Sequence, residues 1–203
     1  MSSPEMILET YESVAQGFAR ARNRSLFERR WLDRLLNHAP ARLPARRVLD
    51  LGCGPGLPIA AYLSERGCAV TGVDGAAAMV ALFRENMPRA TAVEADMRGL
   101  ELGKKFEVVL AWNSFFHLSV EDQRAMFATF AAHAAPRAVL MFTSGPSAGE
   151  AIGEVEGQPV YHASLDPKEY RKLLVDSGFA PISFTPEDPE CFGHSVWLAR
   201  YMG

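Results

Sequence analysis

The stretch Val48-Leu-Asp-Leu-Gly-Cys-Gly-Pro-Gly-Leu-Pro58 decides the fold of this 203-residue chain. An apolar run that contains Asp50 is followed by glycines at alternate positions, Gly52, Gly54 and Gly56. Glycine lets the backbone turn sharply and lets a ligand approach it without side chains in the way. The segment is therefore predicted to be a strand, a ligand-binding turn and the start of a helix, the place where an α/β sheet binds nucleotide-like ligands.

Short apolar runs alternate with helical patterns after this stretch. Strands are expected at 68–73, 91–94, 106–112 and 137–143, and helices at 57–66, 76–86 and 121–134. Such alternation predicts parallel strands joined by crossover helices. A helix at 166–176 and two last strands, at 181–185 and 195–201, predict an antiparallel hairpin at the sheet edge. The expected fold is an α/β, doubly wound Rossmann-like sheet of about seven strands, mostly parallel.

The chain is expected to form a single domain over residues 1–203, with an N-terminal helical cap (1–45) and an α/β core (46–203). The cap is predicted to contain a helix at 5–20 and a second one that runs from a capping box at Ser25 and Glu28 to about His38. The Gly-rich stretch 145–157 is expected to be a surface loop or a lid.

The composition is that of an ordinary soluble protein, with 48% hydrophobic residues, 22% charged residues and a net charge of −3. The N-terminus has neither the basic residues nor the apolar run of an export signal, so a cytoplasmic protein without a membrane partner is expected. The three scattered cysteines predict neither disulfides nor a metal site. Residues 20–47 contain nine arginines, which either attract an acidic partner or form the solvated side of a helix.

Aspartates follow the first three predicted strands. Asp50 suits a cationic ligand and disfavours a dinucleotide, whose fingerprint G-x-G-x-x-G also differs from the spacing G-x-G-x-G found here. Asp74 ends the second strand, where a carboxylate can accept both hydroxyls of a ribose. Asp96 follows the third strand and could accept a hydrogen bond from an adenine amino group.

These motifs resemble the class I S-adenosylmethionine (SAM)-dependent methyltransferase superfamily, particularly its small-molecule members of the methyltransferase domain 11/25 kind. The resemblance spans about residues 46–143 and implies that the loop VLDLGCGPG holds the methionine part of SAM. It further implies that Asp74 binds the ribose and that Asp96 and Met97 hold the adenine. The stretch Ala111–Leu118 would lie along SAM, which makes Trp112 and Asn113 further cofactor candidates.

The resemblance predicts an enzyme that transfers the methyl group of SAM to a small-molecule acceptor by in-line displacement. Asn113-Ser-Phe-Phe116 departs from the Asp/Asn-Pro-Pro-aromatic motif of enzymes that methylate base amines, so nucleic acid is a disfavoured acceptor. His117 is the candidate general base, and Tyr11 and His162 are candidate substrate contacts. Three alternatives stay open: an RNA methyltransferase that uses the Arg-rich 20–47 segment, a non-catalytic SAM-binding protein, and an NAD-dependent oxidoreductase. The oligomeric state and the methylated atom are left undetermined.

Overall fold

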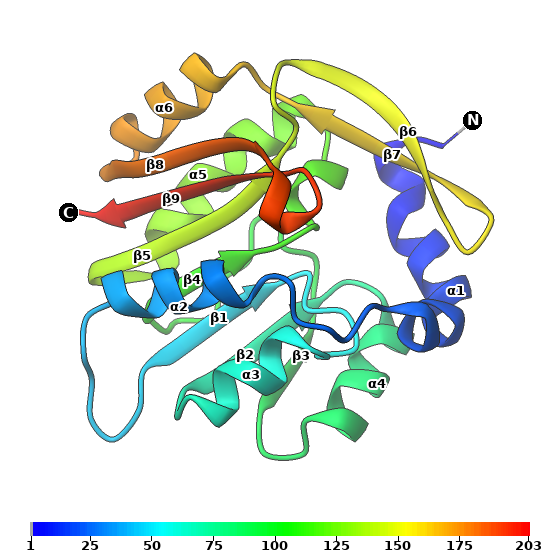
Figure 1. Ribbon diagram of the computed structural model, residues 1–203, viewed down its shortest axis with the longest axis horizontal. Helices are drawn as coiled ribbons and strands as arrows, with labels where there is room; N and C mark the ends of the chain where they lie inside the picture. Colours follow the sequence, from blue (N-terminus) through cyan, green and yellow to red (C-terminus); the bar gives the residue numbers. More distant parts are fainter. Residues whose placement is uncertain (1) are drawn as a thin grey trace.

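The central sheet has seven strands in the order β3-β2-β1-β4-β5-β9-β8 in a computed structural model that describes residues 2–203 (Figure 1). The strands are β1 (Arg47–Leu51), β2 (Ala69–Asp74), β3 (Thr91–Glu94), β4 (Phe106–Ala111), β5 (Ala134–Ser144), β8 (Phe179–Asp188) and β9 (His194–Tyr201). Strands β1 to β5 are parallel, whereas β9 is antiparallel to both β5 and β8. The predicted Rossmann-like sheet with an antiparallel C-terminal hairpin is thereby confirmed.

Helices cover both faces of the sheet. They are α1 (Ile7–Ala21), α2 (Arg29–His38), α3 (Ile59–Glu65), α4 (Ala77–Asn86), α5 (Val120–His133) and α6 (Pro167–Asp176), with short 3₁₀ turns η1 (Pro4–Met6), η2 (Phe115–His117) and η3 (Pro189–Cys191). The central strand β4 is buried along its whole length. Its side chains alternate between the two faces, so Val108 and Leu110 pack with α2 and α3 while Val109 packs with α5. A continuous apolar run is the expected sequence of such a doubly covered strand.

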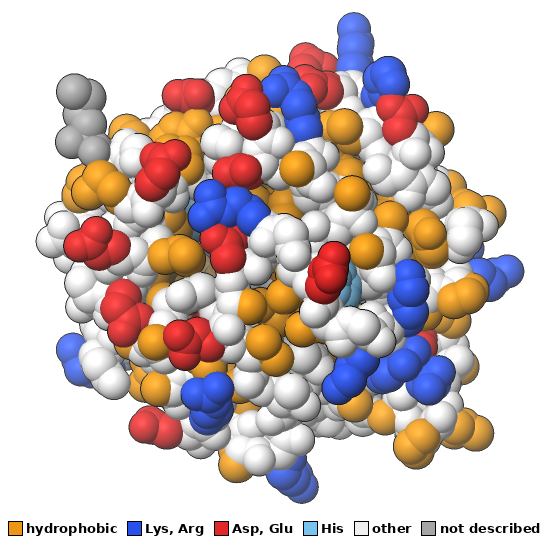
Figure 2. Space-filling model, turned by 180° about the vertical axis from the view of Figure 1, so that it is seen from behind, with side chains coloured by type: hydrophobic (Ala, Val, Ile, Leu, Met, Phe, Trp, Pro, Cys, Tyr) orange, Lys and Arg blue, Asp and Glu red, His pale blue; other side chains and the backbone are white. Residues whose placement is uncertain are grey.

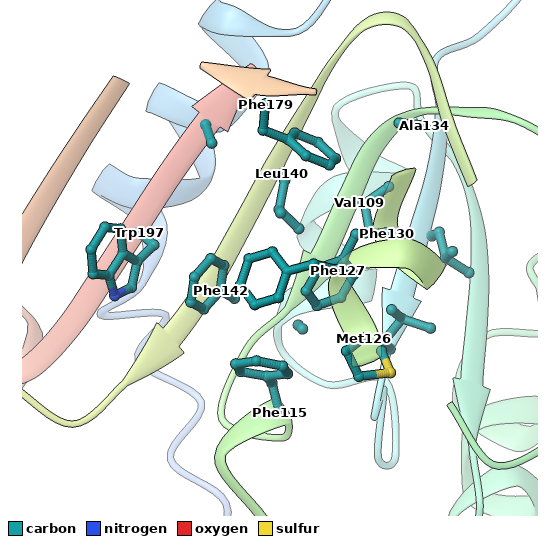
Figure 3. Packing of buried hydrophobic residues seen from close by; sticks show 14 of the residues in the cluster. Val109, Phe115, Met126, Phe127, Phe130, Ala134, Leu140, Phe142, Phe179 and Trp197 are labelled. Atoms are coloured by element: carbon teal, nitrogen blue, oxygen red, sulfur yellow. The ribbon is translucent and has the colours of Figure 1, made fainter. Parts of the chain in front are cut away.

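An aromatic cluster fills the face of the sheet under α5 and α6 (Figure 3). The ring of Phe142, from β5, lies 5.8 Å from that of Trp197 on β9 and 5.2 Å from that of Phe115 in η2. Phe127 and Phe130 enter the same cluster from α5. Because η2 follows β4, this packing fixes the segment that leads from the end of β4 toward α5.

The two N-terminal helices lie in different places. Helix α2 packs on the sheet through Trp31, Leu32 and Leu35, which are at most 2% exposed. Helix α1 instead lies beside α4 and β7, at the end of the sheet where the strands end (Figure 1). The predicted capping box is wrong: α2 begins at Arg29, and the buried Glu28 carboxylate pairs with Arg22 rather than with the backbone of Ser25.

The segment after β5 is the largest difference from the sequence-based expectation. Residues 145–157 were expected to form a loop or lid, but β6 (Gly149–Val155) pairs there with β7 (Gln158–Ser164) as an antiparallel hairpin. The glycines and glutamates of β6 obscure the apolar–polar alternation of a half-buried strand, because β6 is mostly exposed. Among residues 2–203, no helix is long and apolar enough to cross a membrane.

Candidate functional site

The glycine turn after β1 is fixed by hydrogen bonds to the end of β2. The amides of Gly52 and Cys53 donate to the carbonyl oxygen of Val73 over 2.8 and 3.1 Å. The φ angles of Gly52, Gly54 and Gly56 are +71°, +52° and +81°, a region that favours glycine. The turn therefore holds its shape through neighbouring backbone and needs no side chain of its own.

The three glycines have different surroundings. A Cβ atom on Gly52 would lie 2.3 Å from Cβ of Ser114, and one on Gly56 would lie 2.9 Å from a side-chain atom of Phe83. At Gly54 the nearest atom would be in the ring of Phe18, 3.8 Å away. Packing thus requires glycine at the outer two positions, whereas Gly54 borders open space.

Asp74 bridges the glycine turn and the start of α4. Its Oδ2 accepts a hydrogen bond from the amide of Gly54 over 2.9 Å, and its Oδ1 accepts one from the amide of Ala76 over 3.0 Å. Burial raises the pKa of Asp74, although these amides oppose the rise. The amide of Gly75 also lowers the pKa of Asp74, and the carboxylate still has acceptor capacity for a ligand hydroxyl.

Asp50 is a buried carboxylate that nothing in the described chain neutralises. The side chain is 4% exposed, and no residue from 2 to 203 donates a hydrogen bond or forms an ion pair with its oxygens. Burial, and then the neighbouring Asp74 carboxylate, raises the pKa of Asp50 to about 7. A ligand that brings positive charge would relieve both effects.

Asp96 and Met97 follow β3 at the edge of the same region. The guanidinium of Arg98 binds the Asp96 carboxylate, with Nε 2.9 Å from Oδ2, and reaches Asp122 of α5 over 3.3 Å. Burial raises the pKa of Asp96, but the hydrogen bonds from Arg98 outweigh it and hold the pKa below its ordinary value. Asp96 is therefore ionised and held in place by Arg98.

Asn113, directly after β4, is held by β5 and β9. Its amide donates to Oγ1 of Thr143 over 2.8 Å, and its Nδ2 lies 2.8 Å from Nε2 of His194. Because Nδ1 of His194 lies 2.6 Å from the carbonyl of Cys191, that nitrogen carries the proton, and Nε2 accepts from Asn113. The Trp112 ring stacks on His194, and within residues 2–203 its buried Nε1 finds no hydrogen-bond partner.

Tyr11 and His117 form a hydrogen-bonded pair between α1 and η2. The hydroxyl of Tyr11 lies 2.9 Å from Nε2 of His117, whose Nδ1 lies 2.8 Å from the carbonyl oxygen of Tyr161 on β7. The carbonyl can only accept, so Nδ1 carries the proton and Nε2 accepts from Tyr11. Burial lowers the pKa of His117 to about 4. The hydrogen bond to the Tyr161 carbonyl raises this pKa but does not outweigh the effect of burial. The imidazole is thus neutral near pH 7.

All the sequence-predicted site residues line one cavity of about 340 Å³: Tyr11, Asp50, Gly52, Gly54, Gly56, Asp74, Asp96, Met97, Trp112, Asn113, His117 and His162. Strand ends β1, β2 and β4 form its floor, while α1 and the β6–β7 hairpin cover it. Its size falls within the roughly 300–1,000 Å³ range of small-molecule sites.

Sequence reasoning did not place Arg22 at the site, but Arg22 lines the cavity together with Phe18 at the end of α1. Arg22 was counted in the Arg-rich 20–47 segment, whose arginines are partly used within the protein. Five of its nine arginines pair with carboxylates: Arg22, Arg29, Arg30, Arg42 and Arg47. Arg29 pairs with Asp33, and Arg30 pairs with Asp188 and Glu190. Arg42 and Arg47 both pair with Glu107. The other four, Arg20, Arg24, Arg34 and Arg46, form no ion pair within residues 2–203, so the positive charge of the segment is only partly neutralised.

Sequence comparisons relate the chain to known methyltransferases. A profile described as a methyltransferase domain matches residues 48–137. The dTDP-3-amino-3,6-dideoxy-alpha-D-glucopyranose N,N-dimethyltransferase of Streptomyces fradiae is 31% identical over 181 residues, which cover 84% of this chain and 68% of that protein. The malonyl-[acyl-carrier protein] O-methyltransferase of Enterobacter lignolyticus is 39% identical over 106 residues, and the match spans only 40% of its length.

Solved structures share the fold at low sequence identity. An amino pentose methyltransferase from Micromonospora echinaspora with bound SAM aligns with a TM-score of 0.71 at 22% identity, covering 95% of this chain and 97% of that one. The Burkholderia thailandensis 1,6-didemethyltoxoflavin-N1-methyltransferase aligns with a TM-score of 0.74 at 20% identity, covering 100% of this chain and 92% of that one.

Proposed function

Because the chain belongs to the class I SAM-dependent methyltransferases, we propose that it transfers the methyl group of SAM to a small organic acceptor. The observation that carries this proposal is the unneutralised Asp50 carboxylate beside the Gly54–Asp74 bridge in one partly open cavity. SAM carries two positively charged groups, an ammonium and a sulfonium, which suit the unpaired carboxylate of Asp50. Its ribose hydroxyls suit the Asp74 carboxylate, which can accept further hydrogen bonds.

Each part of SAM has a proposed set of residues. Asp50 receives the ammonium group, and the open side of Gly54 leaves room for the methionine chain. Asp74 accepts the ribose hydroxyls, and the Asp96–Met97 pair holds the adenine. Trp112 and Asn113 lie along the ligand at the end of β4. Arg22 is added to the sequence-based set as a cation that can bind the methionine carboxylate.

When bound, SAM supplies an electrophilic methyl group whose carbon bonds to the acceptor atom while the carbon–sulfur bond breaks and leaves its electron pair on sulfur. The contribution of the protein is to align the acceptor and to exclude water, which the cover formed by α1 and the β6–β7 hairpin can do. Tyr11 and His117 are proposed to move a proton: Tyr11 Oη accepts it from the acceptor and passes its own to Nε2 of His117.

A small acceptor is supported by the volume of the partly open cavity, about 340 Å³, which is typical of small-molecule sites. The relatives named above act on an amino sugar nucleotide, a carrier-bound malonyl group and a toxoflavin precursor. The RNA alternative is weakened, because five of the nine arginines of the 20–47 segment pair with carboxylates of the protein.

The proposal is tested by calorimetric titration with S-adenosylhomocysteine (SAH), with NAD in parallel. Wild-type protein should bind SAH and not NAD, Gly54→Val should lose the SAH signal, and Asp74→Ala should bind SAH roughly 10- to 100-fold more weakly. Gly103→Val is the matched control, because Gly103 has a similar φ of +63°, has no atom within 4 Å of an added Cβ and lies outside the cavity. Absence of SAH binding by wild type refutes the proposal. Binding without methyl transfer to any amine or hydroxyl would instead identify a non-catalytic SAM-binding protein.

A further inference from the structure

The cavity lies under two segments that carry glutamates but neither lysine nor arginine. Residues 4–19, with η1 and most of α1, and residues 145–165, with the β6–β7 hairpin, together contain six glutamates and neither lysine nor arginine. We call these two segments the acidic cover; its glutamates are Glu5, Glu9, Glu12, Glu150, Glu154 and Glu156. Figure 2 shows acidic side chains gathered on the side of the molecule where the N-terminus lies. Such a cover repels anions and raises the local concentration of cations.

The cations that line the cavity are already paired. Arg98 binds Asp96 and Asp122, and Arg22 binds the fully buried Glu28 and, in the proposed function, the methionine carboxylate of SAM. No lysine lines the cavity among the described residues. The exposed Glu154 lines it from β6 and has no ion-pair partner within residues 2–203. A carboxylate or phosphate on the acceptor would therefore meet a free carboxylate and no free cation.

The imidazoles beside the acceptor space do not supply positive charge. Burial lowers the pKa of His117 to about 4 and also lowers the pKa of His162, so both rings are neutral near pH 7. They form an aromatic wall with Phe116, whose ring centre lies 4.8 Å from that of His117 and 4.8 Å from that of His162. Aromatic faces attract an ammonium group by cation–π interaction and gain nothing from an anion.

We propose that the acceptor is a small amine that reaches the cavity as an ammonium ion and carries no carboxylate or phosphate group. This inference rests on the proposed function and concerns the acceptor end of the same cavity. Among the usual methyl-accepting groups, the amine is the one that is cationic near pH 7, so it alone gains from the acidic cover and the aromatic wall. Before attack, the ammonium ion loses one proton, which Tyr11 Oη accepts while it passes its own proton to Nε2 of His117. Its nitrogen lone pair then bonds to the methyl carbon of SAM, and SAH leaves with the electron pair of the broken carbon–sulfur bond.

The test uses the full chain saturated with SAH and several matched fragment sets, each offering one ring or chain as an amine, an alcohol and a carboxylate. Ligand-detected NMR and calorimetry measure binding at low salt. Amines should bind at least roughly tenfold more tightly than the matching carboxylates, with alcohols between them. The preference should shrink when salt is raised, because the glutamates of the cover are exposed.

Glu154→Lys should reduce the preference for amines or reverse it. Glu65→Lys makes the same change in net charge at an exposed α3 residue outside the cavity and should leave the preference unchanged. The inference is overturned if carboxylates bind wild type as well as amines do, if no amine binds, or if both variants behave alike. Loss of SAH binding itself would instead count against the proposed function, so the two failures are distinguishable.

Discussion

Replacing Asp50 by asparagine should stabilise the ligand-free protein and weaken SAH binding. The pKa of Asp50 rises from its ordinary value of 3.8 to about 7 in the fold, because burial and the Asp74 carboxylate both disfavour the charge. At about 1.36 kcal/mol for each pH unit, this rise corresponds to a cost of about 4 kcal/mol when the carboxylate is ionised. Asparagine keeps the shape of the side chain and removes its charge. The cost of about 4 kcal/mol is therefore the upper limit for the increase in the free energy of unfolding.

The pH dependence follows from linkage. The folded state binds the Asp50 proton more tightly than the unfolded state does, so the cost is absent below the unfolded pKa of 3.8, grows as pH rises and is complete above about 7. Urea unfolding of wild type and Asp50→Asn at about pH 4, 6 and 8 measures the difference in free energy of unfolding. The free energy of unfolding of Asp50→Asn should exceed that of wild type by more as the pH rises. Calorimetry at about pH 8 should show that the variant binds SAH more weakly than wild type does. A difference that is independent of pH, or a variant less stable at about pH 8, would refute the reasoning.

Gly52→Ala should destabilise the fold by at least roughly 1–3 kcal/mol, because its Cβ would overlap a neighbouring side chain; thermal unfolding measures this loss. Asp74→Ala should lower SAH affinity by roughly 10- to 100-fold, read by calorimetry, because the hydrogen bonds of a charged acceptor are lost. Tyr11→Phe and His117→Ala should each lower turnover by roughly 10²-fold in labelled methyl transfer, and unchanged rates would remove the relay. Since the pKa of His117 is about 4, its protonation should not reduce wild-type turnover between about pH 6 and 8.

The sheet could be predicted because its signals are local. Short apolar runs and the helices between them identify β1 to β5, and parallel strands place their carboxyl ends at one edge. Asp50, Asp74 and the Asp96–Met97 pair lie in or directly after such strands, so sequence position alone brings them to one cavity. The β6–β7 hairpin escaped prediction, because an exposed strand with two glycines lacks the period-two apolar pattern.

Contacts between distant residues could not be read from local patterns. Tyr11 meets His117 across 106 positions of the chain, and His194 meets Asn113 across 81. The sequence singled out Tyr11, Asn113 and His117 as separate candidates, but their hydrogen-bond partners depend on how α1 and β9 pack. The protonated nitrogen of His117 is likewise set by a carbonyl on β7, which belongs to the hairpin that was missed.

The glycine turn shows why a motif does not fix the role of each member. Gly52 and Gly56 are glycines because Ser114 and Phe83 occupy the space that a Cβ would need, so their substitution acts through folding. Gly54 has room for a Cβ and its amide holds Asp74, so substitution there acts on the ligand space in addition to the strain that its φ of +52° imposes. The same residue type at alternate positions thus meets two different demands. Measuring both the free energy of unfolding and the SAH affinity of a variant at each glycine separates the packing role from the ligand-binding role.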